Sequence, residues 1–406
     1  MRHARSLVTA LMLAALAPTQ ALAADVTPEP FLEGLSFPTN MAFAPDGTLF
    51  FTEKETGNVR VVTPEGTLVD RPFITVPVIP EAERGLLGIA LHPAFHREPW
   101  VYLYFSDPAD GRNRLVRVRA AGVVAVGEPQ TLFEGLSAAA GYHNGGDLAF
   151  GIDGTLFVSV GEAHEPDRAQ DPGDVGGKVL RLAGDGSVPA DNPFGPDSPV
   201  WSIGHRNSFG LCVDPRTGEL WETENGPDRD DEVNLIEPGA NYGWPVVTGD
   251  AGDERFNDPF VVFREPIALT GCAVVDGDLW FGSFDGRLWH LPAPDRASRR
   301  VEEAARFPAG VTDVTLGPDG ELYAATSDAI WTLHGVTGTP TSSSASLAPA
   351  TERPGTTEPA PPAEAGEPRG SWRSWIAIGA MVVLASALGA RFLAGRRLRD
   401  EPRPDR

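Results

Sequence analysis

Short apolar runs recur along the chain in pairs, and a turn rich in proline, aspartate and glycine joins the two runs of each pair. Six such pairs lie at residues 41–51, 89–105, 148–158, 211–221, 272–281 and 314–323. The second run of each pair is apolar or aromatic, which is typical of two antiparallel strands joined by a tight turn. Each pair is therefore predicted to form a β-hairpin.

The hairpins repeat at an irregular interval of roughly forty to sixty residues, which suits four-stranded propeller blades with loops of varying length. No helical periodicity of useful length occurs between the two ends of the chain. We therefore predict an all-β fold, a six-bladed β-propeller over residues 24–336. A β-sandwich is the competing fold, but similar hairpins at this spacing favour the propeller.

The amino end has the three regions of an export signal. Arg2, His3 and Arg5 give it a positive start, residues 7–17 are mostly apolar, and Ala-Leu-Ala at 21–23 is a small-residue cleavage site. A buried amphipathic helix is the alternative, but it does not explain the order of the three regions. Residues 1–23 are predicted to be a signal peptide.

The carboxyl end is predicted to anchor the protein in a membrane. Residues 337–370 are rich in Pro, Thr, Ser, Ala and Glu, and such a linker cannot bury a core. Residues 371–395 are predicted to form a transmembrane helix, because the run from 375 onward is apolar with Arg391 as its only charge. The basic tail 396–406 should stay in the cytoplasm. The propeller would then lie on the extracytoplasmic side of a bacterial cell membrane.

Acidic residues outnumber basic residues, 56 against 33, and the formal net charge is −23. This balance argues against a nucleic-acid partner and is compatible with cation sites. The predicted propeller contains two cysteines, Cys212 and Cys272, each at the start of a predicted strand. An oxidising compartment permits a disulfide between them if the two strands are neighbours. Two buried free thiols would give the same sequence, so both states stay open.

Polar residues gather around the hairpin at 211–224. His205-Arg206-Asn207 precede it, and Glu224-Asn225-Gly226-Pro227 end it and lead into an acidic run. A solvated acidic loop is the plain interpretation. However, propellers place their sites where the loops before the inner strands converge around the central channel. These loops are predicted to carry the function.

Several segments, in order, resemble the family of soluble quinoprotein glucose dehydrogenase, aldose sugar dehydrogenase and sorbosone dehydrogenase. They are GLLGIALHPAF at 85–95, HNGGDLAFG at 143–151, GGKVLRL at 176–182, VPADNPF at 188–194, GHRN at 204–207 and NGPDRDDEVNLIEPGANYGWP at 225–245. The resemblance spans about residues 31–334. It implies a six-bladed propeller that binds pyrroloquinoline quinone (PQQ) on a Ca²⁺ at the channel mouth.

The resemblance also implies a role for individual residues. His143 matches the general base that takes the proton from the anomeric hydroxyl of the sugar, a role that suits imidazole because it titrates near neutral pH. Glu162 matches the carboxylate that holds this histidine. Arg206 and Asn207 match residues that bond the quinone oxygens. From the residues alone, a loop histidine hydrogen-bonded to backbone is the first interpretation of His143. Arg206 is also compatible with a structural arginine paired to Asp231 or Glu232.

A second group of matches concerns the metal and the rim of the site. Gly226 and Pro227 match positions whose carbonyls hold the calcium, although they are also compatible with a simple turn. Asp231 matches an acidic neighbour of that metal, and Glu83 stands where the glucose enzyme has a cofactor-binding glutamine.

The chain departs from the glucose enzyme at cationic positions. That enzyme has a lysine where this chain reads Ser-Phe-Asp-Gly at 283–286, and a pair of arginines where it reads Gly-Val-Thr at 310–312. PQQ carries three carboxylates and needs basic partners. Arg84, Arg229 and Arg287 are the candidate substitutes.

The sequence therefore predicts an exported, membrane-anchored, PQQ- and Ca²⁺-dependent sugar dehydrogenase. It would oxidise an aldose at the anomeric carbon and pass the electrons to an external acceptor. The alternative is a non-catalytic cell-surface propeller that binds a glycan or a protein partner.

Overall fold

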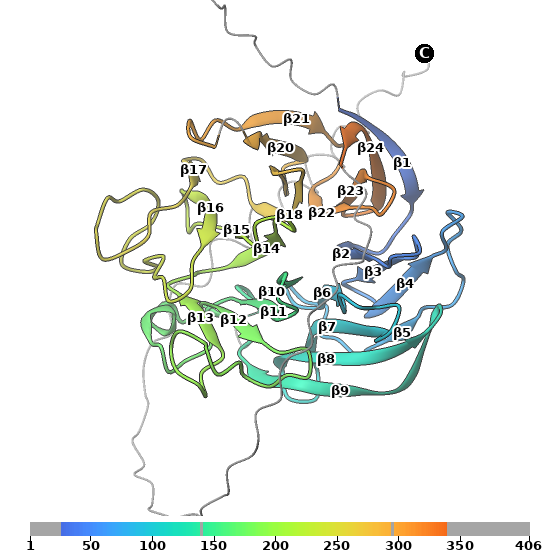
Figure 1. Ribbon diagram of the computed structural model, residues 1–406, viewed down its shortest axis with the longest axis horizontal. Helices are drawn as coiled ribbons and strands as arrows, with labels where there is room; N and C mark the ends of the chain where they lie inside the picture. The colour runs from blue at the N-terminus through green and yellow to red at the C-terminus, as the bar shows by residue number, and fades with distance from the viewer. Residues whose placement is uncertain (1–25, 139–140, 294–295, 339–406) are drawn as a thin grey trace, which may run out of the picture. The chain divides into compact units, whose positions relative to one another are not determined.

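A computed structural model describes residues 26–138, 141–293 and 296–338. Six four-stranded antiparallel sheets are arranged in a ring around a central channel (Figure 1). The predicted six-bladed β-propeller is confirmed. The 3-10 helix η1 (Pro166–Gln170) lies between β11 and β12.

Each blade is a meander that runs outward from the channel. Blade 1 consists of β2 (Pro38–Phe43), β3 (Leu49–Glu53), β4 (Asn58–Val62) and β5 (Ile74–Thr75). Blade 2 consists of β6 (Leu86–Leu91), β7 (Trp100–Asp107), β8 (Arg112–Ala121) and β9 (Val124–Leu136). Blade 3 consists of β10 (Gly145–Phe150), β11 (Leu156–Val160), β12 (Lys178–Leu182) and β13 (Val200–Ile203).

The second half of the ring repeats this arrangement. Blade 4 consists of β14 (Ser208–Val213), β15 (Leu220–Glu224), β16 (Asp231–Ile236) and β17 (Val261–Phe263). Blade 5 consists of β18 (Leu269–Val275), β19 (Asp278–Ser283), β20 (Arg287–Leu291) and β21 (Glu302–Arg306). Blade 6 consists of β22 (Val311–Leu316), β23 (Glu321–Thr326), β24 (Ala329–Thr337) and β1 (Thr27–Glu33).

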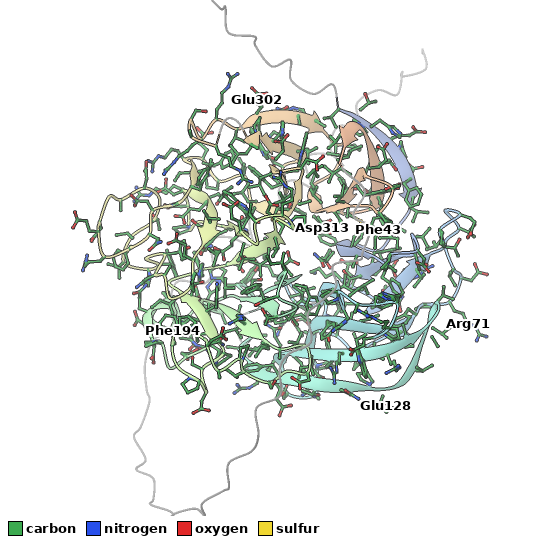
Figure 2. All side chains as sticks on the ribbon, in the orientation of Figure 1. Phe43, Arg71, Glu128, Phe194, Glu302 and Asp313 are labelled. Atoms are coloured by element: carbon green, nitrogen blue, oxygen red, sulfur yellow. A yellow bond between two sulfur atoms is a disulfide. The ribbon has the colours of Figure 1, made fainter. Side chains whose placement is uncertain are left out.

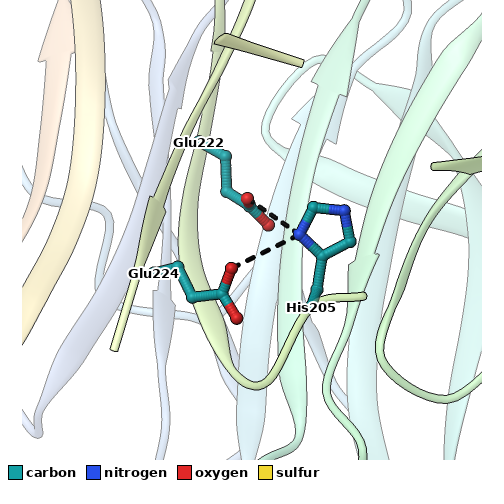
Figure 3. Close-up of side chains that lie close together, drawn as sticks. All are labelled: His205, Glu222 and Glu224. Carbon is teal, nitrogen blue, oxygen red and sulfur yellow. Dashed lines mark hydrogen bonds and ion pairs between the residues drawn. The ribbon is translucent and has the colours of Figure 1, made fainter. Parts of the chain in front are cut away.

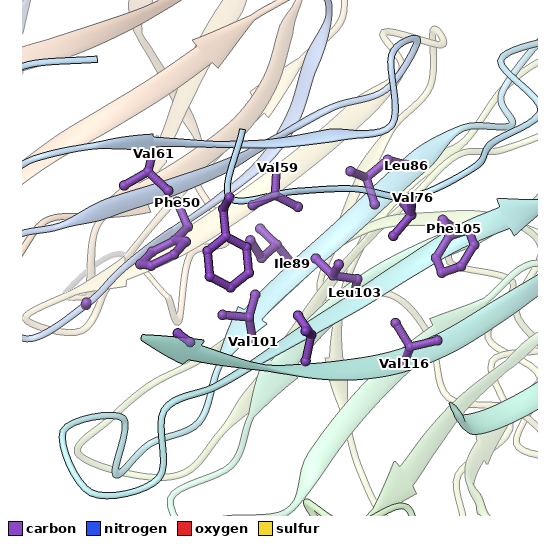
Figure 4. Packing of buried hydrophobic residues seen from close by; sticks show 14 residues of the cluster. Phe50, Val59, Val61, Val76, Leu86, Ile89, Val101, Leu103, Phe105 and Val116 are labelled. Atoms are coloured by element: carbon purple, nitrogen blue, oxygen red, sulfur yellow. The ribbon is translucent and has the colours of Figure 1, made fainter. Parts of the chain in front are cut away.

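The six hairpins predicted from the sequence are the two inner strands of the six blades. Their side chains alternate across each sheet and pack against the blades on either side. The buried apolar residues form one cluster at each of the six contacts between neighbouring blades. Between blades 1 and 2, for example, Phe50, Val59 and Val61 pack against Ile89 and Leu103 (Figure 4). Burial between blades, rather than one central core, therefore holds the ring together.

The ring closes through the amino-terminal strand. β1 pairs antiparallel with β24 in a register that runs from Thr27 opposite His334 to Glu33 opposite Ala329. Blade 6 thus combines strands from both ends of the propeller. A second link joins blades 4 and 5, where Cys212 in β14 and Cys272 in β18 form a disulfide. This settles the state of the cysteines that the sequence left open.

Predictions for the two ends of the chain lie outside the described residues. They are the signal peptide at 1–23, nearly all of the linker at 337–370, the transmembrane helix at 371–395 and the basic tail at 396–406. Within residues 26–138, 141–293 and 296–338, no helix has the length and apolar character needed to cross a bilayer.

On one face of the ring lie the loops before the first strand and after the second strand of each blade. Since the two inner strands of a blade are antiparallel, the loop before the first and the loop after the second lie at the same end. Every inner pair also has a register shift near this end, for example between Gly145 and Leu148 in blade 3. Such bulges re-aim side chains at the ends of strands. All the predicted site residues lie on or next to these loops, and we call this side the loop face.

Candidate functional site

The imidazole of His143 is bonded to a buried carboxylate. His143 lies in the loop before β10, and Glu162 follows the end of β11 in the same blade. The His143 Nδ1 and Glu162 Oε1 atoms are 2.7 Å apart, and the two residues are 7% and 1% exposed. With the glutamate as acceptor, the proton sits on Nδ1 and leaves Nε2 as the proton acceptor of the ring. His143 is therefore bonded to a carboxylate rather than to backbone.

The backbone around His143 is tightly held. Its φ of 57° lies in the left-handed region, which costs a non-glycine residue energy and clusters at functional sites. The next residue, Asn144, accepts a hydrogen bond from Asn113 Nδ2 at its side chain (3.0 Å) and one from Tyr104 Oη at its carbonyl (3.0 Å). A Cβ at Gly161 would lie 2.1 Å from the His143 carbonyl oxygen, so the neighbouring loop needs glycine there. Blade 2 and the β11 loop together fix where the imidazole points.

Glu83 connects the loops of three blades. From the loop before β6, its Oε2 atom accepts hydrogen bonds from the His143 backbone N (2.7 Å) and from Asn207 Nδ2 (3.2 Å). The Asn207 Oδ1 atom in turn accepts a hydrogen bond from Gly145 N (3.3 Å). The structure therefore brings Glu83, His143, Glu162 and Asn207 together, as the resemblance implies.

Arg206 lies next to this group, at the start of blade 4. Its Nη1 atom donates to the Asn225 carbonyl (2.8 Å), and its guanidinium lies 5.4 Å from the centre of the Trp244 ring. Its Nε atom is buried and has no hydrogen-bond partner among the described residues. Burial lowers the pKa of this guanidinium, and the charges of Glu162 and Glu224 oppose that effect. Arg206 is not paired with Asp231 or Glu232, so a buried donor is left available to an anionic or quinone oxygen.

His205, the neighbour of Arg206, faces the interior. Its Nδ1 atom lies 3.0 Å from Glu222 Oε2 and 3.4 Å from Glu224 Oε2 (Figure 3). Ser202 Oγ lies 2.8 Å from its Nε2. Burial by itself would lower the pKa of His205, but the two carboxylates outweigh burial and raise the pKa to about 10. Among the described residues this triad is the one His, Asp and Glu group spaced like metal ligands. A charged imidazolium with both nitrogens bonded makes it an ion-pair cluster that supports the Arg206 loop.

The loop after β15 carries the predicted calcium carbonyls. Gly226 and Pro227 line a small pocket together with Arg206, Glu224, Asn225, Asp230, Glu232 and Trp244. Asp231, the first residue of β16, accepts a hydrogen bond from Gly226 N on Oδ1 (2.8 Å) and bonds from Ile267 N (2.7 Å) and Ala268 N (2.8 Å) on Oδ2. Both its oxygens are thus occupied by backbone, and Asp231 shapes the loop from behind.

The pocket beside Gly226 is rich in oxygen atoms. The Asn225 Oδ1 atom is buried without a hydrogen-bond partner among the described residues. Burial and the charge of Glu224 raise the pKa of Glu232 to about 8, as expected where buried carboxylates are crowded together. Carbonyl, amide and carboxylate oxygens are the ligands that Ca²⁺ prefers. The donor set at this loop therefore fits a calcium ion.

Two aromatic rings beside His143 were not predicted. The His164 ring stacks on the His143 ring with 4.0 Å between centroids, and Tyr142 lies 5.6 Å from His164. Burial and the neighbouring His143 lower the pKa of His164, which favours a neutral ring in the stack. His164 follows Glu162 by only two positions, so proximity to a matched residue was the available signal. Tyr142 and His164 are exposed, and their rings form a platform next to the His143 imidazole.

The three arginines suggested as PQQ partners each have an acidic partner already. Arg84 Nη2 lies 2.9 Å from Glu81, and Arg229 Nε lies 3.4 Å from Asp230. Arg287 forms an ion pair with Asp285. Their charges are therefore largely balanced within the protein.

Comparison with known proteins connects this geometry to an enzyme family. The family model described as Glucose / Sorbosone dehydrogenase matches residues 35–333. The PQQ-bound aldose sugar dehydrogenase of Streptomyces coelicolor is 32% identical and superposes with a TM-score of 0.70, covering 77% of this chain and 99% of that one. The quinoprotein glucose dehydrogenase B of Acinetobacter calcoaceticus is 33% identical over 55% of this chain and 53% of its own length. An aldose sugar dehydrogenase of Escherichia coli K12 is 29% identical over 75% of this chain and 91% of its own.

Proposed function

The chain belongs to the glucose/sorbosone dehydrogenase family of PQQ-dependent oxidoreductases, and we propose that it oxidises an aldose at the anomeric carbon. The observation that carries this proposal is the His143–Glu162 pair, which presents a free imidazole nitrogen beside Asn207 and Arg206 on the loop face. A propeller that only bound a partner would not need a buried carboxylate to orient an imidazole at the channel mouth.

The residues act on the sugar as follows. PQQ, when bound, supplies the two-electron acceptor for the hydride that leaves the anomeric carbon. His143 Nε2 takes the proton of the anomeric hydroxyl, and the Glu162 carboxylate holds the ring and stabilises the imidazolium that forms. Arg206 and Asn207 offer donors to the oxygens on which negative charge develops. Glu83 holds the loops of His143 and Asn207 together, because its carboxylate accepts a hydrogen bond from each.

We propose that Ca²⁺ binds at the loop of Gly226 and Pro227, through their backbone carbonyls. The unpartnered Asn225 oxygen and the crowded carboxylates nearby support this assignment. The ion would hold the cofactor and polarise it. Asp231 contributes by fixing the loop, since both its oxygens are bonded to backbone.

We also propose that the enzyme is exported and held at the outer face of the bacterial cell membrane by one helix at 371–395. The three-part amino end and the charge pattern of the carboxyl end support this. The disulfide is compatible with an oxidising compartment. Electrons would then leave to an external acceptor.

Aldose-dependent dye reduction by the purified full-length protein tests the proposed activity. The protein, loaded with PQQ and Ca²⁺, is expected to reduce an artificial electron acceptor only when an aldose is added. His143→Ala should lose this activity while the circular dichroism spectrum of the folded propeller stays unchanged. Absence of turnover with every aldose in a broad panel would favour the non-catalytic propeller.

A further inference from the structure

At residues 310–312, where the glucose enzyme has a pair of arginines, the space for a side chain at Gly310 is filled by Phe284. A Cβ at Gly310 would lie 2.5 Å from the Phe284 carbonyl oxygen and 2.7 Å from a carbon of the Phe284 ring. Thr312, two residues on, is occupied by a hydrogen bond from its Oγ1 to the Pro38 carbonyl (2.7 Å). The Phe284 ring therefore lies over the start of blade 6, and no basic side chain can enter there without moving it.

Phe284 reaches across blade 6 to blade 1. Its ring stacks on Phe37, with 6.1 Å between centroids and 30° between planes, although Phe284 remains 47% exposed. Phe37 precedes β2 and has a left-handed backbone with φ of 57°. An exposed Phe284 ring that packs on a residue with a strained backbone is costly unless it serves a purpose. It forms an apolar rim on the side of the loop face opposite His143.

Lys54 lies behind this rim. It follows the end of β3, its backbone N donates to the Phe37 carbonyl (3.0 Å), and its carbonyl accepts from Leu86 N (3.1 Å). A Cβ at Gly85 would lie 2.6 Å from Lys54 Cγ, so the side chain runs along the same loop that carries Glu83. The ammonium lies 5.3 Å from the centre of the Phe37 ring.

The ammonium of Lys54 has no hydrogen bond or ion pair within the described residues, although the residue is only 8% exposed. Burial lowers the pKa of this lysine, and the charges of Glu55 and Glu83 only partly offset that effect. A partly desolvated ammonium without an ionic partner gains when an anion arrives. Arg84, Arg229 and Arg287 already have acidic partners.

We infer that Lys54 binds a carboxylate of the quinone cofactor, with the Phe37–Phe284 pair packing beside it, in place of the cations found on blades 5 and 6 of the glucose enzyme. The inference rests on the proposed function, because it assumes that PQQ occupies the loop face. The basic side chain that binds the carboxylate then lies on blade 1, and the Phe37–Phe284 pair fills the space that the arginines would take.

Titration of the metal-stripped, Ca²⁺-reconstituted full-length protein with PQQ tests this inference through the dissociation constant, read from the quinone absorbance. Lys54→Gln should weaken PQQ binding on the order of 10- to 100-fold, since one charge-assisted bond is lost, and should reduce the salt dependence of binding. Lys54→Arg should restore affinity to within about threefold of the unsubstituted protein.

Arg287→Gln is the matched control, because it removes one positive charge from the same face but from a side chain already paired with Asp285. It should change PQQ affinity less than about twofold. Equal affinity of Lys54→Gln and the unsubstituted protein would overturn the role of Lys54 and leave the proposed function standing. Failure of the unsubstituted protein to bind PQQ would instead contradict the proposed function itself.

Discussion

The two sides of the loop face are built by different interactions. We call the loops of blades 2, 3 and 4, with Glu83, His143, Glu162, Arg206 and Asn207, the polar half. We call the loops of blades 5, 6 and 1, with Phe284, Gly310, Phe37 and Lys54, the aromatic half. In the polar half, hydrogen bonds such as that from Asn207 to Glu83 tie three blades together. In the aromatic half, the packing of Phe284 on Phe37 and the ammonium of Lys54 define the surface.

This difference suggests that the polar half serves the chemistry and the aromatic half serves retention of the cofactor. The polar half retains the residues that the family resemblance assigns to proton transfer and quinone contact, and their geometry is fixed by buried partners. The aromatic half departs from the glucose enzyme at the positions that would hold the carboxylates of the cofactor. Substitutions in the first half should therefore impair chemistry, and those in the second should impair retention of the cofactor.

The largest effect is expected for His143→Ala. Loss of a positioned base should lower turnover about 10²- to 10⁴-fold, while the PQQ dissociation constant changes less than about threefold, because His143 is not a charged partner of the cofactor carboxylates. Steady-state dye reduction and PQQ titration on the same preparation give both values. Turnover that survived the substitution would remove His143 as the base and break the distinction between the halves.

Arg206→Ala should affect both quantities, since Arg206 lies at the junction of chemistry and cofactor binding. Loss of a desolvated charged donor should weaken PQQ binding by about 1.5–3 kcal/mol, roughly ten- to a hundredfold. Turnover at saturating PQQ should also fall. A variant that bound PQQ normally would show that the unpartnered Nε atom does not face the cofactor.

Phe284→Lys in the Lys54→Gln background asks whether the aromatic half can be returned to the arrangement of the glucose enzyme. The introduced ammonium would stand on blade 5, beside the start of blade 6. Affinity for PQQ should recover about tenfold if an ammonium on blade 5 can bind the cofactor carboxylate in place of Lys54 on blade 1. The same PQQ titration measures this recovery. No recovery would indicate that the Phe37–Phe284 packing is itself required.

The smallest effect concerns an electrostatic interaction between Asp147 and Asp313, which lie on the innermost strands of blades 3 and 6. Burial raises the pKa of Asp313 in β22 to about 6 (Figure 2). Burial and the Asp313 charge together raise the pKa of Asp147 in β10 to about 7. Both values exceed that of an unfolded aspartate, about 4. The folded state therefore holds protons that the unfolded state has released, and stability falls as pH rises from about 4 to about 7.

Asp313→Asn should reduce that fall by about 1–2 kcal/mol, because it removes the charge that opposes ionisation of Asp147. The amide oxygen can still accept the bonds that Asp313 Oδ2 receives from Met41 N (2.8 Å) and Thr315 Oγ1 (3.0 Å). Urea unfolding at pH 5 and pH 8 measures the change. Parallel pH dependences in the two proteins would show that neither the titration of Asp313 nor its effect on Asp147 contributes to stability.

The sequence predicts the ring well because each inner hairpin is formed by one short segment of the chain, which contains two apolar runs and a turn. It does not predict the closure. β1 reads Thr-Pro-Glu-Pro-Phe-Leu-Glu, which lacks the alternation of a buried strand because it forms an exposed edge. The disulfide stayed open for a similar reason, since the proximity of Cys212 and Cys272 depends on the ring.

The same limit applies to the site. Residues of the polar half follow from short motifs whose members are close in the chain. Lys54 and Phe284 come from blades 1 and 5, and they meet at the Phe37 ring only because blade 6 closes the circle. No local sequence pattern could show that Lys54 and Phe284 lie close together. The family resemblance showed only that the lysine and arginines of the glucose enzyme are absent from 283–286 and 310–312.

The most direct test of the account is the titration of the metal-stripped full-length protein with PQQ in the presence and absence of Ca²⁺. Since the donor set beside Gly226 and Asn225 fits a calcium ion, we predict saturable PQQ binding that requires Ca²⁺ and that Arg206→Ala weakens. No binding at high micromolar PQQ with Ca²⁺ present would contradict the account, because the propeller would then have kept the geometry of the site without its cofactor.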